Sequence, residues 1–443
     1  MADKRMNTIG LGRTDGNLNE PEVRRIIAAA ADDIRPDGRR VLVIIPDGTR
    51  TCPLPMVTRE LYSAVGRRAK RFDLLIALGT HPPMGEQQID RLLGVSRGKR
   101  AEVFGKTQVF NHRWNDPAAL RKIGTLSAEQ VKEITGGLFS MRIDVTINKL
   151  LFDYDAVLVC GPVFPHEVAG FSGGAKYFFP GVCGEELLNF FHWLGAVITC
   201  PRIIGTRITP VRTLLHAATD MMGIDKFALC MVVKDHGLPT VPHGVGGQAG
   251  LAGMYFGDVK EAWSQAADLS NRLHVTYVDR PFVSVLSRAP EMYDELWVGA
   301  KCMYKLEPVV ADGGELIIHA PHIREISVTH GKLIREIGYH VRDYFLAQWD
   351  KFRGYPWGVL AHSTHVRGIG AYENGLENPR IRVTLATGIP EALCRKINLG
   401  YRDPRSINTA DWEGREADGR LYVPHAGEML YKLKNLPPWQ RFE

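Results

Sequence analysis

Residues 39–47 read RRVLVIIPD: two arginines, an unbroken apolar run and a polar ending. A run of this kind is typical of a parallel strand whose two faces are both buried. Residues 72–80, FDLLIALGT, repeat the pattern, and residues 56–69 between them place apolar side chains at helical spacing. Buried strands that alternate with amphipathic helices predict an α/β fold built on a parallel sheet.

The alternation continues along the chain and indicates two domains. Residues 1–277 would form the first α/β domain, and a second α/β series over 278–404 would form the other. Residues 405–443 have little periodicity, and we expect them to pack back on the first domain. Further predicted elements are strands within 143–165 and over 227–234, 281–290, 314–321, 357–364 and 380–388, helices over 257–273 and 332–352, and a Gly/Pro-rich loop over 236–250.

The composition argues against several classes of protein. The 443 residues are 45% hydrophobic and 23% charged, and the net charge of +6 is spread without a basic tract, so neither nucleic-acid binding nor a membrane partner is expected. The seven cysteines are odd in number and form no CxxC pair, which is typical of reduced, mostly buried thiols. No signal peptide or run of about 18 apolar residues is present, so a cytoplasmic location is expected.

Polar side chains follow three of the predicted strands. Asp47 and Arg50 come after the first strand, His81 after the second, and His166 after the strand that ends near residue 165. In open parallel sheets, ligands bind outside the carboxyl ends of the strands. Because these strand ends would deliver an acid, a base and two imidazoles toward one edge, the sequence predicts an enzyme.

Two of these loops have a functional and an ordinary interpretation. The loop DGTR at 47–50 could hold a phosphate, a ribose or a carboxylate, because arginine offers a bidentate fork; it could equally be a solvated loop. In GTHPP at 79–83, the prolines would fix the direction of a catalytic His81, although a histidine in a surface turn fits the same letters.

Residues 166–192, HEVAGFSGGAKYFFPGVCGEELLNFFH, concentrate further candidates. The glycines of GFSGGAK at 170–176 could bring backbone N–H groups to an anion, with Ser172 and Lys176 as added donors, or the segment could be a plain tight turn. His192 lies among large apolar residues, as core histidines often do. The histidines of the second domain fit substrate contacts and surface positions equally well.

Taken together, DGTR, GTHPP, HEVAGFSGGAKYFFPG and His192 resemble the lactate racemase family, whose enzymes use a nickel-pincer nucleotide. Order and spacing agree, since Lys176 lies 10 residues after His166 and His192 lies 16 after Lys176. A weaker match is DELWVGAK at 294–301. The resemblance implies two Rossmann-like α/β domains, a cofactor-binding domain and a substrate domain, with the active site in the cleft between them.

The resemblance also implies a role for each matching residue. Lys176 would hold the nucleotide (pyridinium-3-thioamide-5-thiocarboxylic acid mononucleotide nickel) covalently, and His192 would ligate nickel. His81 and His166 would be the acid/base pair that acts during reversible hydride transfer between substrate and cofactor. The remaining implied contacts are Asp47, Thr49, Arg50, Phe171, Ser172, Gly173 and Gly174 with the cofactor, and Arg50, Trp297 and Lys301 with the substrate.

The implied activity is racemisation or epimerisation of a small 2-hydroxy acid, an isomerase reaction. Relatives that act on lactate commonly have arginine where Ala175 stands and Tyr-Gln where Trp297-Val298 stand. Because Val298 cannot donate to a carboxylate, we expect a substrate other than lactate, such as a sugar acid. The alternatives are a related sugar-acid epimerase or dehydratase and a cofactor-less paralogue that binds an acidic ligand. Whether the chain forms a homo-oligomer stays open.

Overall fold

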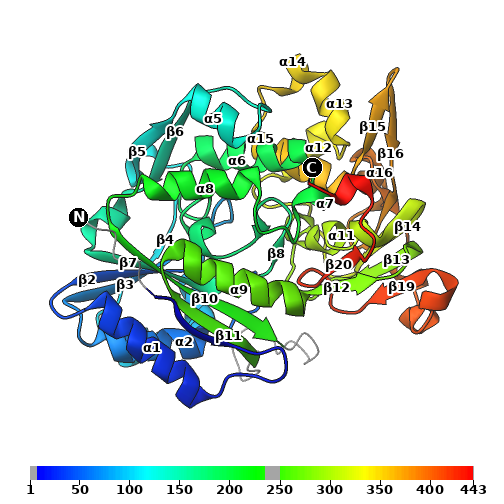
Figure 1. Cartoon of the computed structure of the whole chain (residues 1–443). Helices are drawn as coiled ribbons and strands as arrows, with labels where there is room; N and C mark the ends of the chain where they lie inside the picture. The colour runs from blue at the N-terminus through cyan, green and yellow to red at the C-terminus, as the bar shows by residue number, and fades with distance from the viewer. Residues whose placement is uncertain (1–6, 235–249, 443) are drawn as a thin grey trace. The chain divides into compact units, whose positions relative to one another are not determined.

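The computed structural model describes residues 7–234 and 250–442 (Figure 1). The predicted loop at 236–250 therefore lies almost wholly outside the described residues. The chain divides into two compact units, one made of residues within 1–164, 171–188 and 212–273, the other of 165–170, 189–211 and 274–443. Each unit is built on its own sheet, and the predicted α/β class is confirmed.

The first unit contains a seven-stranded sheet with the order β1-β11-β10-β7-β2-β3-β4. The strands from β10 to β4 run parallel, whereas β11 and β1 are antiparallel additions at one edge. The strand bounds are β1 Ile9–Gly12, β2 Arg40–Ile45, β3 Arg71–Ile76, β4 Val109–Asn111, β7 Ala156–Pro162, β10 Asp225–Lys234 and β11 Gly250–Gly257, with a separate antiparallel pair of β5 Leu120–Leu126 and β6 Ile143–Asn148.

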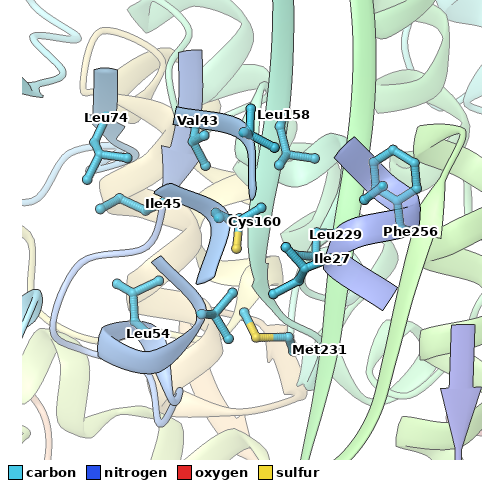
Figure 2. Packing of buried hydrophobic residues seen from close by; sticks show 14 of the residues in the cluster. Ile27, Val43, Ile45, Leu54, Leu74, Leu158, Cys160, Leu229, Met231 and Phe256 are labelled. Carbon is cyan, nitrogen blue, oxygen red and sulfur yellow. The ribbon is translucent and has the colours of Figure 1, made fainter. Parts of the chain in front are cut away.

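Alternate side chains of this sheet form a core on one face. Figure 2 shows Val43 and Ile45 of β2, Leu158 of β7, Leu229 of β10 and Ile27 of helix α1 (Glu20–Ile34) within this core. Because successive strand residues point to opposite faces, an unbroken apolar strand supplies a core on both faces. The helices of this unit are α1, α2 Leu54–Leu61, α3 Glu86–Leu92, α4 Arg100–Phe104, α5 Ala128–Ile134 and α9 Val259–His274, with α6 Glu185–Ile198 and α8 Pro210–Asp220 shared with segments of the second unit.

The second unit contains a parallel five-stranded sheet with the order β18-β17-β14-β13-β19. A parallel pair of β12 and β20 and an antiparallel pair of β15 and β16 complete it. The bounds are β12 Val275–Val278, β13 Phe282–Arg288, β14 Val310–Ala320, β15 Gly370–Glu373, β16 Leu376–Pro379, β17 Arg382–Thr387, β18 Gly400–Tyr401, β19 Arg420–Val423, β20 Leu430–Leu433, α7 Cys200–Ile203, α10 Leu296–Gly299, α11 Lys301–Tyr304, α12 Gly331–Ile337, α13 Arg342–Ala347, α14 Trp349–Phe352, α15 Trp357–Arg367 and α16 Glu391–Lys396.

The structure corrects three expectations from the sequence. Residues 357–364 form helix α15 and not a strand: burial of nearly the whole helix removes its amphipathic pattern, and a short apolar run does not separate a buried helix from a buried strand. The single helix expected over 332–352 is broken into α12, α13 and α14, with Gly338 at a φ of 74° where α12 ends. Residues 405–443 belong to the second unit, because β19 extends the sheet beside β13 and β20 pairs with β12.

All seven cysteines are free and six of them are buried, as the composition predicted. Across the two described ranges, no helix is long and apolar enough to cross a membrane.

Candidate active site

The first unit brings Asp47 and His81 into contact. They follow β2 and β3, which are neighbouring parallel strands, so both loops begin at the same edge of the sheet. The Nδ1 atom of His81 lies 2.5 Å from Oδ2 of Asp47. Oδ1 of Asp47 accepts from the Thr49 hydroxyl at 2.6 Å and from the Thr49 backbone N–H at 3.1 Å. The convergence predicted from these two strand ends is confirmed.

The surroundings of Asp47 keep its carboxylate ionised. Burial raises the pKa of Asp47, but His81, the Thr49 hydrogen bond and the charge of Arg50 outweigh burial and hold that pKa well below its usual range. An ionised Asp47 accepts the Nδ1 proton of His81, which leaves a lone pair on Nε2 of the same ring. Asp47 therefore fixes His81 in the tautomer that can act as a general base.

The turn that carries Lys176 is tied to the His81 loop. Lys176 is half-buried in a single 3₁₀ turn, Gly174–Tyr177. In the loop that follows, the Gly181 carbonyl accepts a hydrogen bond from the Gly79 N–H at 3.0 Å. The Tyr177 ring packs so closely against Gly161 that a Cβ there would lie 1.7 Å from its hydroxyl oxygen. Burial raises the pKa of Tyr177, and the nearby Arg50 opposes that rise. The DGTR, GTHPP and GGAK segments thus meet within the first unit.

The Gly/Ser turn before Lys176 is held by bonds inside the protein. The Ser172 hydroxyl donates to the Pro162 carbonyl at 3.2 Å and accepts from the Phe164 N–H at 2.9 Å. Gly174 has a φ of 56°, and a Cβ there would lie 2.7 Å from Cβ of Trp263. The glycine therefore serves the close packing of the turn, and a phosphate contact by Ser172 would require its present bonds to break.

Arg212 and Trp263 support this turn and were missed by the sequence analysis. The Arg212 guanidinium donates to the carbonyls of Phe171 and Gly173 and lies 4.0 Å from the centre of the Trp263 ring. Burial lowers the pKa of Arg212 to about 9, so the group is still charged near neutral pH. Trp263 Nε1–H donates to the Ser172 carbonyl at 2.9 Å. The sequence signal that could have indicated this role is an arginine on the apolar, buried face of helix α8, because a buried arginine needs hydrogen-bond acceptors nearby.

In the second unit, His166 ends the short strand β8 (Pro165–His166) and is buried. Its Nδ1 atom accepts from the backbone N–H groups of Val168 at 3.1 Å and Ala169 at 3.3 Å. A nitrogen that accepts carries no proton in the neutral ring, so Nε2 of His166 holds the proton. Oε2 of Glu167 lies 3.4 Å from the same Nδ1 and would stabilise a second proton on the ring. His166 and His81 therefore rest in opposite tautomers.

Trp297 lies in a cluster of histidines in the second unit, and His192 is near one of them. The Trp297 ring stacks on His362 with 3.8 Å between centroids and 7° between planes, and His330 lies 4.4 Å from it. Burial lowers the pKa of His362 to about 3, and the nearby His192 contributes in the same direction. His362 is therefore neutral, and His192 lies near it.

Lys301, one turn beyond Trp297, is half-buried, and its ammonium lies 4.7 Å from the centre of the Tyr293 ring. Within the described ranges, no group of three or more His, Cys, Asp or Glu side chains is arranged to hold a metal ion. Any metal at His192 would therefore depend on ligands that do not come from such a group.

Known proteins resemble both the sequence and the fold. Residues 20–203 match the lactate racemase N-terminal domain. The chain is 26% identical over 164 residues to the lactate racemase of Lactiplantibacillus plantarum and equally to that of Thermoanaerobacterium thermosaccharolyticum, covering 34% of each. Residues 20–203 therefore belong to the lactate racemase family. The chain spans about a third of the length of these curated relatives. The residues that match the family model, 20–203, include Asp47, His81, Lys176 and His192.

Solved structures extend the similarity to nearly the whole chain. A crystal structure of a Thermotoga maritima protein superimposes with a TM-score of 0.85 at 34% identity, covering 96% of this chain and all of that one. The lactate racemase apoprotein of T. thermosaccharolyticum superimposes with a TM-score of 0.66 at 17% identity, covering 93% of both chains, and so shares the fold. The lactate racemase family fold therefore extends beyond the N-terminal domain of this chain.

Proposed function

We propose that this chain is a racemase or epimerase that acts on the hydroxyl-bearing carbon of a 2-hydroxy acid. The observation that carries the proposal is the Asp47–His81 pair, which presents a basic Nε2 beside the turn of Lys176 in a domain of the lactate racemase family. Inverting a secondary alcohol requires a base for the hydroxyl proton and a means to remove and return the carbon-bound hydrogen. His81 supplies the base, and the hydrogen requires a cofactor.

The residues of the chain fit the nickel-pincer nucleotide. Lys176 offers a half-buried amine in a short 3₁₀ turn, a position suited to covalent attachment of the nucleotide. His192 offers one imidazole, which suits a metal that brings its other ligands with an organic group. Bound there, the nucleotide would supply reversible acceptance of the substrate's hydride.

The protein's own part in the reaction is proton transfer and orientation. Nε2 of His81 takes the hydroxyl proton, and the Asp47 carboxylate stabilises the imidazolium that forms. His166 carries a proton on Nε2 that it can donate to a substrate oxygen; when Nδ1 is also protonated and paired with Glu167, the ring can give up its Nε2 proton and stay neutral. Arg50 and Lys301 are the cationic candidates for the substrate carboxylate.

The proposed substrate is larger than lactate and more hydroxylated, such as a sugar acid. Lactate-acting relatives commonly carry arginine at the position of Ala175. Here that position holds a small, fully buried side chain without charge. Trp297 and Val298 replace two polar positions with an indole and an apolar side chain. Two of the second-domain histidines that could have contacted the substrate, His362 and His365, are buried in α15, with 9% and 5% of their surface exposed. The substrate hydroxyls must then find their partners elsewhere in the second unit.

The test is production of the full chain together with the enzymes that make the cofactor, followed by intact mass, nickel content and a screen of deuterium-labelled 2-hydroxy acids and aldonates. We expect a covalent mass adduct, bound nickel, and exchange or inversion with a sugar acid faster than with lactate. Lys176→Ala should lose the adduct, whereas the exposed Lys99→Ala should keep it. A wild-type chain without adduct or nickel under these conditions would instead support a cofactor-less binding protein.

A further inference from the structure

The second unit contains a cavity of about 720 Å³ that shares no lining residue with the candidate active site. It lies among the end of α6, helix α13, the β15–β16 hairpin and the C-terminal turn around Trp439. Cavities of roughly 300–1,000 Å³ are the size that proteins use for small molecules. The cavity is therefore large enough for a ligand of its own.

The charged lining of this cavity is dominated by three arginines, Arg202, Arg342 and Arg380, against a single acid, Asp312. Arg380 is fixed: its Nη1 donates to the Val310 carbonyl at 2.7 Å and pairs with Asp312 at 3.1 Å, and its Nη2 donates to the Glu307 carbonyl at 2.7 Å. The Arg342 guanidinium pairs with Asp343 and donates to the Val197 carbonyl at 2.8 Å. Arg202 is half-buried, and its guanidinium has no hydrogen bond or ion pair with any residue that the structure describes.

An apolar wall stands beside the arginines. The guanidinium carbon of Arg380 lies 4.1 Å from the centre of the Trp439 ring, and Ile369 and Pro379 also line the cavity. This combination offers charge for an anionic group and a surface for the carbon skeleton that bears it.

A narrow extension of about 50 Å³ shares Thr199, Arg342 and Ile369 with the main cavity. Two of the residues that line it, His365 and Glu307, each carry a buried polar atom (Nε2 and Oε2) that has no hydrogen-bond partner among the described residues. Burial raises the pKa of Glu307, which weakens its repulsion of an anion. Buried polar atoms are normally paired, so these two indicate a place that a ligand or water fills.

We propose that this cavity binds a small organic anion with more than one acidic oxygen group, through the guanidiniums of Arg202, Arg342 and Arg380. Arginine recognises carboxylate and phosphate alike in bidentate geometry, so the shared chemistry is a multivalent oxyanion. Thr199 lines the cavity directly after the end of α6. Its φ is 91°, a conformation that a β-branched residue adopts only where its surroundings enforce it. Because Arg342 also binds the last turn of α6, the site contacts the helix that bears His192.

Calorimetric titration of the full chain at low ionic strength would test the site, with inorganic pyrophosphate as the phosphoryl probe and citrate as the carboxylate probe. We expect one of them to bind, with an affinity that falls as salt rises. Arg202→Gln should weaken that binding at least about tenfold, the usual effect of losing one charge-assisted contact. Arg353→Gln is the matched control, since it removes an equal charge from an exposed position of the same unit.

Hydrogen exchange supplies a second readout that does not depend on the variant. The bound anion should protect backbone amides of residues 369–380 and 199–203 in the wild-type protein. The proposal is overturned if neither probe binds at about 10 mM, the range of very weak affinity. It is also overturned if Arg202→Gln binds as the wild type does, or if the protected amides lie outside these segments.

Discussion

Exchange of Asp47 for asparagine is the sharpest test of the candidate active site. The new side chain would keep an oxygen for the Thr49 hydroxyl and N–H, but its amide would present N–H to Nδ1 of His81. Nδ1 would then accept, the proton would move to Nε2, and the lone pair needed for base catalysis would be lost. The substitution is nearly isosteric, so it changes the tautomer with little change in packing.

The size of the effect follows from two contributions. A hydrogen bond to a charged group is worth about 1.5–3 kcal/mol, which corresponds to a rate loss of about 10- to 150-fold. The wrong tautomer adds to this loss, and the same exchange in the serine-protease triad costs about 10⁴-fold. We therefore expect kcat to fall by about 10²- to 10⁴-fold in the Asp47→Asn protein.

Two measurements check this prediction. Racemisation or epimerisation by the cofactor-loaded protein gives kcat, and ¹⁵N-detected imidazole spectra of the apoprotein report which nitrogen of His81 carries the proton. Asp90→Asn is the control, because Asp90 is also buried and accepts from the Gly98 N–H and Arg100 outside the candidate site. If Asp47→Asn keeps both the wild-type tautomer and the wild-type kcat, the role given to Asp47 is wrong.

Three further predictions concern proton transfer, packing and pH. His166→Ala should abolish interconversion and leave the Lys176 mass adduct in place, while the exposed His425→Ala keeps activity; an active His166→Ala protein would remove His166 from the mechanism. Gly174→Ala should lower the free energy of unfolding in urea by about 2–4 kcal/mol, since strain and overlap with Trp263 add, against about 1 kcal/mol for Gly136→Ala, where φ is also positive but the space is open. Burial lowers the pKa of Lys432 to about 8, so the folded protein loses this proton before the unfolded chain does, and stability should rise between pH 8 and 10.5. Lys432→Met should flatten that rise, worth about 3 kcal/mol, whereas the exposed Lys434→Met should not; equal pH profiles for the two would contradict the burial argument.

The sequence predicted the α/β class and most strands of both units. The runs that became β2, β3 and β7 are apolar without interruption, and that pattern depends only on burial of both faces. It was insufficient where a helix is buried all round, as α15 is, because the helical period then disappears from the hydrophobic pattern. The hydrophobic pattern also could not predict where residues 405–443 pack, because β19 pairs with β13, a strand far away in the sequence.

The candidate site divides in the same way. Because parallel strand ends share an edge, sequence order was enough to predict that Asp47 and His81 meet. The tautomers of His81 and His166 were not predictable, since each depends on which group faces Nδ1, a carboxylate in one case and two backbone N–H groups in the other. Tertiary structure alone brought Arg212 beneath the Gly/Ser turn and gathered Arg202, Arg342 and Arg380 around one cavity, because residues so distant in sequence become neighbours only when the chain folds.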